Sequence, residues 1–316
     1  MAGYLIRRLL LSLVTLWIVS FMVFSLLRIV PGDTVTALIA DTGLVPKENI
    51  DAVRADLGLD KPFIQQYATW MGNLLRGDFG ESFVRRQSTM VDIKEALPVT
   101  VEIAVVSILL SLFIGMPLGI VAALRRNGMV DHFTRVFGSL GIAVPDFFIG
   151  TIVIICMGKY LHYLPPLGFK AVWEDPLTNA AQMWIPCTLI ALRLSAVTMR
   201  MTRSVMVEVL TQDFVRTARA KGLHPMVVSV RHATRNAVLP VITVVASQFG
   251  ALLGGALVME TLFSLPGLGQ STLTSIQRRD YAQVQMNALF VATIIVVLNI
   301  IVDLAYAALD PRVRVR

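Results

Sequence analysis

The sequence predicts an all-α integral membrane protein with six transmembrane helices. Of its 316 residues, 55% are hydrophobic and only 16% are charged, and the mean hydropathy is +0.70, above the balance of soluble globular domains. The basic residues behind the net charge of +7 lie mostly at the ends of apolar runs, which is typical of membrane topology. They are not interleaved with aromatic residues as in a nucleic-acid groove, so we expect no nucleic-acid partner.

Six apolar runs are long enough to cross a bilayer, because a helix rising about 1.5 Å per residue needs about 20 residues to span about 30 Å of hydrocarbon. They are residues 9–30, 99–124, 133–160, 184–201, 238–259 and 287–309. The first follows Arg7 and Arg8, as a secretory signal would, but it is too long for the apolar core of a signal and no small-residue cleavage site follows. We expect it to be retained as a transmembrane helix.

Basic residues in short loops predict the orientation of these helices. Four basic clusters fall on one side of a six-helix arrangement: Arg7 with Arg8, Arg125 with Arg126, the stretch 200–235, and the C-terminal arginines. That side is predicted to be cytoplasmic, with both termini on it. The chain then divides into an N-terminal tail and helix (1–30), an extracytoplasmic segment (31–98) and a membrane core (99–316).

The extracytoplasmic segment carries turn signals at residues 31–33 and 77–80 and two amphipathic helical patterns between them. The first pattern starts near Pro46 and spaces Ile50, Val53 and Leu57 on one face; the second spaces Ile64, Tyr67, Met71 and Leu74. We expect two short helices on the outer membrane surface. Two interpretations stay open: a docking ledge for an external partner, or a cap over the ends of the membrane helices.

The loop 213–236 predicts a helix, a tight turn and a second helix. Asp213 suits the start of the first helix because it can accept hydrogen bonds from unpaired N–H groups. Gly222 suits the left-handed position just past that helix, and Pro225 suits the first turn of the next one. Small residues at the turn leave backbone accessible, and basic residues remain available for a partner: Ala218, Ala220, Arg216, Arg219 and Lys221.

This loop resembles the coupling loop of bacterial ABC importer permeases, in the variant of the dipeptide, oligopeptide, nickel and glutathione branch. Residues 216–222 read Arg-Thr-Ala-Arg-Ala-Lys-Gly, residues 231–237 read Arg-His-Ala-Thr-Arg-Asn-Ala, and Leu239-Pro240 follows. Of the general importer pattern, Glu-Ala-Ala then three residues and Gly, only Ala218 and Gly222 match; the peptide branch shows the form present here. Further segments resemble that branch in order: 7–8, 31–33, 57–62, 77–80, 263–269, 278–281 and 310–312.

The resemblance implies a type I ABC importer permease fold, of the first-permease type, in the bacterial cytoplasmic (inner) membrane. It implies that the loop docks into a groove on a separate ATPase and transmits its closure. The residues in this role would be Asp213, Arg216, Thr217, Ala218, Arg219, Ala220, Lys221, Gly222, Leu223, His224 and Pro225. The implied partners are a second related permease, two ATPase subunits and an extracytoplasmic solute-binding protein, beside membrane lipid.

The chain itself is not expected to be an enzyme. It has no GxxxxGK[ST] motif, so ATP and magnesium are expected on the partner subunits, and no cofactor on this chain. The expected cargo is a dipeptide or oligopeptide, with glutathione or a nickel chelate as alternatives because those importers share the motifs. An ion-coupled secondary transporter, the rival from another class, would need paired buried carboxylates or broken helices in repeated halves, and the two halves of this sequence show no such symmetry. A membrane-embedded protease would need motifs such as HExxH or GxSxG within a helix.

Two ionisable residues within the predicted helices are candidates for the translocation pathway or a gate: Asp146, directly after Pro145, and Arg193. At matched depth they would pair with each other or line the path. The alternative is that Asp146 accompanies a proline kink while Arg193 extends to water. The loop 263–269, with Phe263 and Pro266, is predicted as either an outer gate or a surface turn, and Glu260 as interfacial.

Small and sulfur-containing residues complete the prediction. Gly115 and Gly119 in one helix, and Gly250, Gly254 and Gly255 in another, allow close helix approach, within the chain or in a dimer. Cys156 and Cys187 are expected to be buried unpaired thiols, with a disulfide as the alternative. The sequence has no CxxC and no histidine cluster at ligand spacing, so no metal site is expected.

Overall fold

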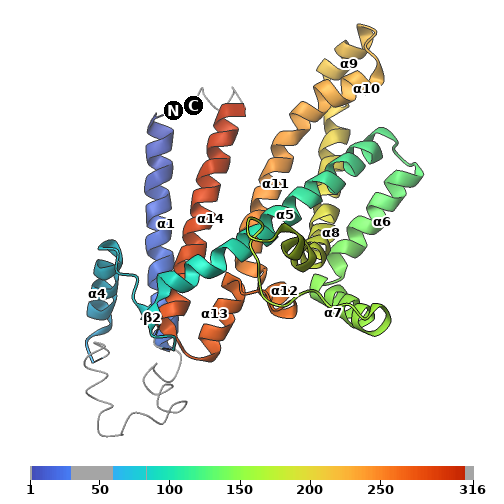
Figure 1. Cartoon of the computed structure of the whole chain (residues 1–316). Coiled ribbons are helices and arrows are strands. Elements are labelled where there is room, and N and C mark those ends of the chain that lie inside the picture. Colours follow the sequence, from blue (N-terminus) through green and yellow to red (C-terminus); the bar gives the residue numbers. More distant parts are fainter. Residues whose placement is uncertain (1, 30–59, 83, 310–316) are drawn as a thin grey trace. The chain divides into compact units, whose positions relative to one another are not determined.

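The computed structural model describes residues 2–29, 60–82 and 84–309 (Figure 1). It forms two units: Met1–Pro98 with Pro266–Val297, and Val99–Leu265 with Leu298–Arg316. Apart from one short hairpin, the regular structure of the described residues is helical. The turn at residues 31–33, the helix expected near Pro46 and the motifs at 57–62 and 310–312 lie wholly or partly outside the described residues.

Four helices are long and apolar enough to cross a membrane: α1 (Ala2–Ile29), α5 (Thr89–Leu124), α8 (Pro176–Val209) and α14 (Tyr281–Leu309). Two bent pairs pass the same criterion. One joins α6 (Met129–Ala143) to α7 (Asp146–Cys156) and the turn η2 (Met157–Leu161); the other lies within residues 228–254. The described residues therefore hold four to six membrane-spanning segments, at the positions of the six predicted runs.

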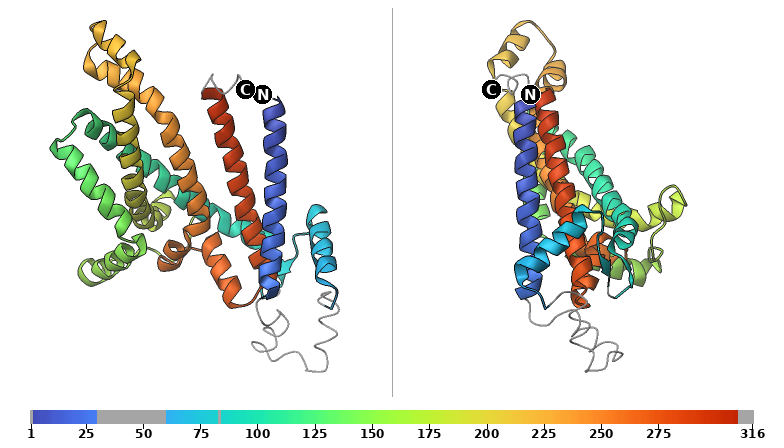
Figure 2. Two further views of the ribbon diagram at one scale, coloured as in Figure 1. Left: turned by 180° about the vertical axis from the view of Figure 1, so that it is seen from behind. Right: turned by 90° about the vertical axis from the view of Figure 1, so that its left-hand side faces the viewer.

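The third run is not one straight helix: it bends at the proline kink that the sequence left open. α6 and α7 meet at 89°, and Figure 2 shows α7 turned away from the α6 axis. Proline lacks an N–H donor and restricts the residue before it to extended backbone. Accordingly, Val144 is extended, at φ −94° and ψ 121°, and α7 begins after Pro145. The depth that a straight helix would assign to Asp146 is therefore wrong.

In the first unit, α4 (Phe63–Leu75) packs on α1 through aromatic rings. The Phe21 and Tyr67 ring centroids lie 5.2 Å apart, and those of Phe24 and Tyr67 5.3 Å apart, both edge-on. The hydroxyls of Ser20 and Tyr67 share a hydrogen bond of 2.9 Å. The predicted amphipathic helix around Tyr67 is confirmed, and its aromatic face is covered by α1.

The rest of the first unit is a small apolar core with hydrogen-bonded polar side chains beside it. It contains the hairpin of β1 (Glu81–Ser82) and β2 (Gln87–Ser88), the start of α5, α13 (Leu268–Gln277) and the first part of α14. Ile93, Ala96, Leu268 and Met286 are buried together. Above them, Asn287 donates to the hydroxyls of Ser271 and Thr272, and Gln283 donates to Asn287. These hydrogen bonds offset part of the cost of burying the polar side chains.

In the second unit, α5, α6, α7 and α11 (Thr234–Gly255) all contact α8. The N-cap of α8 is Asp175, whose carboxylate accepts from the Thr178 hydroxyl at 2.6 Å and the Thr178 N–H at 3.1 Å. These bonds hold the pKa of Asp175 below its usual range because they stabilise the charged form. Proline follows the cap, as the start of a helix favours.

Glycines bring α5 against α8, as predicted for this helix. A Cβ atom at Gly119 would lie 2.7 Å from the Met199 carbonyl oxygen and 2.8 Å from Thr202 Cβ; at Gly115 it would lie 3.0 Å from the Ser195 carbonyl oxygen. Gly254 in α11 has no such neighbour within 4 Å. The prediction is therefore confirmed for Gly115 and Gly119 and wrong for Gly254 as an intramolecular contact.

Replacing Gly119 by alanine tests this contact. The added methyl group has no room unless α5 and α8 separate, which we expect to cost about 1–3 kcal/mol of stability and to lower the thermal midpoint of the detergent-solubilised protein. Gly254→Ala is the matched control, because its Cβ meets open space. Equal midpoints for the two variants would contradict the assigned packing.

Candidate functional site

The loop predicted to bind a partner starts with the helix α9 (Asp213–Ala220). The N-cap is Gln212, whose side chain makes no capping hydrogen bond, so the prediction that Asp213 caps this helix is wrong by one position. Asp213 is instead the first helical residue, where a negative charge favours the positive end of the helix dipole. Its carboxylate lies 3.5 Å from the Arg216 guanidinium, and both side chains are exposed.

The turn after α9 has the predicted geometry. Gly222 has φ +76°, which L-residues with a side chain rarely adopt. The Gly222 N–H donates to the Arg219 carbonyl at 2.9 Å and the Leu223 N–H donates to the Ala218 carbonyl at 3.4 Å, so the last carbonyls of α9 are satisfied within the turn. No atom lies within 4 Å of a Cβ built on Gly222; backbone conformation, and not space, requires glycine here.

The second arm of the loop is longer than predicted. α10 (Pro225–Val227) does start at the predicted proline, but it continues through the π-helical turn η3 (Val228–Ala233) directly into α11. The expected second short helix is therefore the beginning of a membrane-length segment, bent by 47° around residues 238–240. Helical structure is therefore continuous from Pro225, three residues after the turn at Gly222, into that segment.

The two arms are packed together. Val215 and Ala218 of α9 are buried against Val228, with Leu210 at the edge. At the base, Met206 and Val209 of α8 pack with Ala233 and Ala237 of the second arm and with Ala123 of α5. Ala218 is thus part of the loop's own core, and the prediction that it leaves backbone open to a partner is wrong; Ala220 is exposed. The loop is a packed unit joined to three helices.

Its outer surface combines apolar and cationic side chains. Figure 1 shows α9 and α10 at the ends of α8 and α11. The exposed apolar residues are Phe214, Leu223, Met226, Val227 and Val230, and the exposed cations are Arg216, Arg219, Lys221 and Arg231. We call these nine residues the loop face. Apolar anchors with arginines beside them are typical of surfaces that bind another protein.

The two candidate pathway residues form an ion pair. Arg193 Nε lies 3.0 Å from an Asp146 carboxylate oxygen, with side-chain exposures of 41% and 20%. The other Asp146 oxygen accepts the Phe147 N–H at 3.0 Å. The pairing that the sequence left open is present, between the first turn of α7 and the middle of α8. Both side chains are part-exposed.

The loop after α12 (Leu257–Leu262) is anchored at its start. Phe263 and Leu265 are buried, Pro266 is exposed, and the Leu265 N–H donates to the Glu260 carbonyl at 2.8 Å. The Glu260 side chain is fully buried and accepts the Thr100 hydroxyl at 2.6 Å. The sequence predicted Glu260 at the membrane interface but did not predict its burial within the protein: α12 turns it inward, and it ties this loop to α5.

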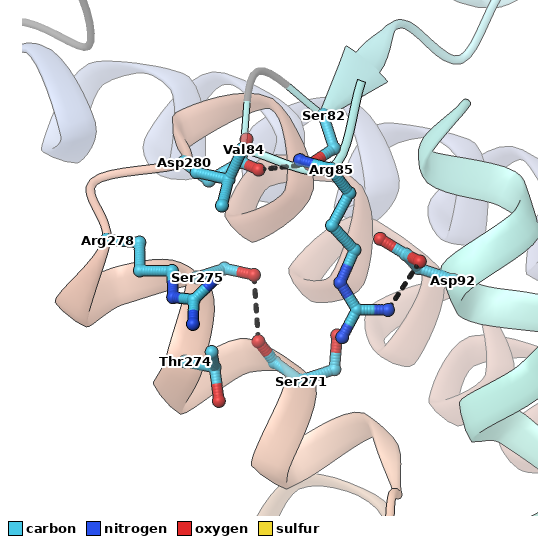
Figure 3. A pocket seen from close by; sticks show the side chains of 9 residues that line it. All are labelled: Ser82, Val84, Arg85, Asp92, Ser271, Thr274, Ser275, Arg278 and Asp280. Atoms are coloured by element: carbon cyan, nitrogen blue, oxygen red, sulfur yellow. Dashed lines mark hydrogen bonds and ion pairs between the residues drawn. The ribbon is translucent and has the colours of Figure 1, made fainter. Parts of the chain in front are cut away.

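A polar pocket in the first unit was not predicted from the residues (Figure 3). Ser82 donates to the buried Asp280 carboxylate, and Arg85 pairs with the buried Asp92 at 2.9 Å. An adjoining cavity of about 250 Å³ is lined by Arg85, Asp92, Glu95, Ala96, Pro266, Gly267, Gln270, Ser271 and Thr274. The only sequence feature that pointed to this pocket was the motif at 278–281, which contains Asp280. The spacing of that motif does not indicate that Asp280 contacts the hairpin.

The cysteines are not bridged. Cys187 is buried as expected, whereas Cys156 is exposed, contrary to the expectation that both are buried. Across residues 2–29, 60–82 and 84–309 no three His, Cys, Asp or Glu side chains gather as a metal site would require.

Comparison with known proteins identifies the family. Residues 115–315 match the binding-protein-dependent transport system inner membrane component family, and residues 1–104 match the N-terminal part of such membrane components. The chain belongs to this family. It is a multi-pass permease of the cytoplasmic membrane, and the resemblance to ABC importer permeases of the peptide branch is confirmed.

Named relatives cover the whole chain. The di/tripeptide transport system permease DppB of Pseudomonas aeruginosa and the dipeptide transport system permease DppB of Escherichia coli are each 36% identical, over 99% of both chains. A putative peptide transport system permease of Brucella abortus is also 36% identical, over 99% of both chains. The permease thus aligns with these relatives from end to end.

Replacing Val215 by serine tests the packing of the loop. Loss of this buried side chain is worth about 1.5–3 kcal/mol, so we expect trypsin to cleave after Arg216, Arg219 or Lys221 about 10–150 times faster. The exposed Val230 is the matched position, and Val230→Ser should leave the cleavage rate unchanged. The same rate in both variants would show that α9 is not packed on the second arm.

Proposed function

We propose that this permease is one of two channel-forming subunits of an ATP-driven importer, and that the loop face binds a partner ATPase. The observation that carries the proposal is the construction of the loop: a glycine turn, an internal core and a second arm that continues as helix into a membrane-length segment. A loop that served only to fix topology would need its charges but not this packing. ATP and magnesium would be held by the partners, and this chain would contribute the pathway.

The proposed orientation places the loop and both termini in the cytoplasm and the first unit's hairpin outside. Its support is the clustering of Arg7 with Arg8, Arg125 with Arg126, and the cations of the loop face on one side. On the outside, an extracytoplasmic solute-binding protein would deliver the cargo, as the family description implies for its members. Within the extracytoplasmic segment 31–98, α4 and the hairpin are the described elements available to it.

The mechanism follows from how the loop is attached. Binding of ATP shifts a conformational equilibrium only if it changes contacts differently in the two states. When the ATPase closes on the loop face, the loop can move only together with the ends of α8 and α11, because its base is packed between them. Closure would thereby change the arrangement of the helices that surround the pathway. The pathway would open first toward the binding protein and then toward the cytoplasm.

The proposed cargo is a dipeptide or oligopeptide, in line with the printed names of the relatives. Uptake by the reconstituted complex, with its own binding protein, distinguishes the alternatives. We expect dialanine to be carried and competed by other short peptides, and not by glutathione or a nickel–histidine chelate. Uptake driven by an ion gradient without ATP would instead identify a secondary transporter.

Replacing Gly222 by valine tests the coupling role. The left-handed backbone at this position is strained for any β-branched residue, so the turn should open and ATP-driven uptake should fall at least about tenfold, while membrane insertion is unchanged. Gly168→Val is the control, because Gly168 has φ +84° and equally open space around a Cβ, but lies in another loop.

Normal uptake by the Gly222 variant would reject the coupling role. Reaction of Leu223→Cys with a membrane-impermeant thiol reagent, applied outside intact cells of a Cys156→Ser variant, would reject the orientation.

We also propose that Asp146, Arg193, Phe263 and Pro266 contribute to the pathway or its gate. The part-exposed Asp146–Arg193 pair offers one charge for each terminus of a peptide. Asp146→Asn and Arg193→Gln should therefore each slow uptake by about 5–30-fold, the effect of one or two kcal/mol. The charge-exchanged double variant should not recover, since the termini would meet the wrong charges. Full recovery, measured as initial rate, would show that the pair only holds α7 to α8.

A further inference from the structure

A second aspartate, which the mechanism above does not use, lies at the start of the bent segment, before the bend that carries Asp146. Asp131, in the first turn of α6, is completely buried in the second unit. An ionised carboxylate without water is stable only when it is paired and fully hydrogen-bonded. The residues around Asp131 must therefore supply an opposite charge and hydrogen bonds to both carboxylate oxygens.

Both oxygens of the Asp131 carboxylate are occupied. The guanidinium of Arg203, from α8, meets them with two nitrogens: Nε bonds one oxygen, and Nη2 lies 3.1 Å from the other. That second oxygen also accepts from Arg135 at 3.0 Å and from the Asn127 N–H at 2.9 Å. A bidentate arginine fixes direction as well as distance, so α6 and α8 have one relative position in which all these bonds exist.

Side-chain packing along the same two helices supports that fixed position. A Cβ atom at Gly141 would lie 2.8 Å from Ala196 Cβ, and one at Gly138 would lie 3.6 Å from the Ala196 carbonyl oxygen. Thr134, between Asp131 and this contact, is buried too. α6 therefore has close packing in its middle and a buried ion pair at its start, both against α8.

The position of Arg203 in the chain connects this contact to the loop. Arg203 lies near the end of α8 that leads into α9, one turn before Met206 in the core at the base of the loop. The Asp146–Arg193 pair, at the other end of α6, is by contrast part-exposed and uses a single pair of atoms. Next to the loop the carboxylate is fully buried and the Arg203 side chain is 24% exposed, whereas the distant carboxylate and arginine are 20% and 41% exposed.

We propose that Asp131 and Arg203 are positioning residues, which make α6 move with α8 when the loop face is displaced, so that movement of the ATPase reaches the bent segment. The inference rests on the proposed function of the loop. Without the pair, α8 would be displaced with the ATPase but α6 would not. ATP hydrolysis would then be uncoupled from transport.

The test uses the complete complex, reconstituted with its ATPase subunits and binding protein, and measures dialanine carried per ATP hydrolysed. Asp131→Asn and Arg203→Gln should still bind the ATPase subunits and hydrolyse ATP, with the transport ratio lowered about 5–30-fold. Arg203→Lys, which keeps a charge beside Asp131 but loses the bidentate geometry, should recover part of the ratio lost in Arg203→Gln. Arg126→Gln is the matched control and should behave as the wild type. It removes a charge from the connection between α5 and α6, and no contact of Arg126 with Asp131 is present among the described residues.

An unchanged ratio in Asp131→Asn would overturn the inference. A wild-type protein that neither binds nor stimulates the ATPase subunits would instead reject the proposed function, so the two failures are distinguishable.

A spectroscopic measurement does not depend on the folding of these variants. Spin labels at Val136→Cys on α6 and Glu208→Cys on α8, with Cys156 and Cys187 replaced, report the distance between the helices in the otherwise unchanged complex. We expect the same distance with and without trapped ATP. A change of distance between the two states would show that α6 does not move with α8, and would overturn the inference.

Discussion

Close packing against one helix, α8, holds the second unit together. α5 reaches it through Gly115 and Gly119, where the backbones are separated by little more than van der Waals contact. α6 reaches it through Gly141 and the Asp131–Arg203 pair, and α11 through a hydrogen bond from Gln248 to the Leu194 carbonyl. Lipid supplies no hydrophobic force between helices, so small residues and polar contacts have to supply the association. A displacement of α8 is therefore felt by each helix on it.

The same constraint explains where the chain leaves regular helix. In hydrocarbon an unpaired backbone group is costly, and breaks are tolerated where protein covers them. The break at Pro145 is followed by an ion pair to α8. The break between α11 and α12 is followed by the buried Glu260, which binds Thr100. At both breaks a carboxylate therefore bonds to a neighbouring helix, which stabilises the irregular backbone there.

Sequence patterns predicted the parts of the site whose chemistry is local. The glycine turn at Gly222, the proline start at Pro225 and the helix around Tyr67 depend on backbone preferences and on periodicity over a few residues. The Asp131–Arg203 pair was missed because its members are far apart in the chain. In the sequence, Asp131 stands in a basic loop and Arg203 in a basic stretch, and both are typical of membrane topology.

The sequence by itself determined the class, the membrane-length segments and the family, because hydropathy, basic clusters and short motifs are properties of consecutive residues. Only the tertiary structure decided that the third segment bends by 89°, that Ala218 supports the loop from within, and that Glu260 and Asp131 are buried. The reason is physical: the cost of burying a carboxylate or bending a helix is offset by partners from other helices, and sequence spacing does not reveal which helices those are.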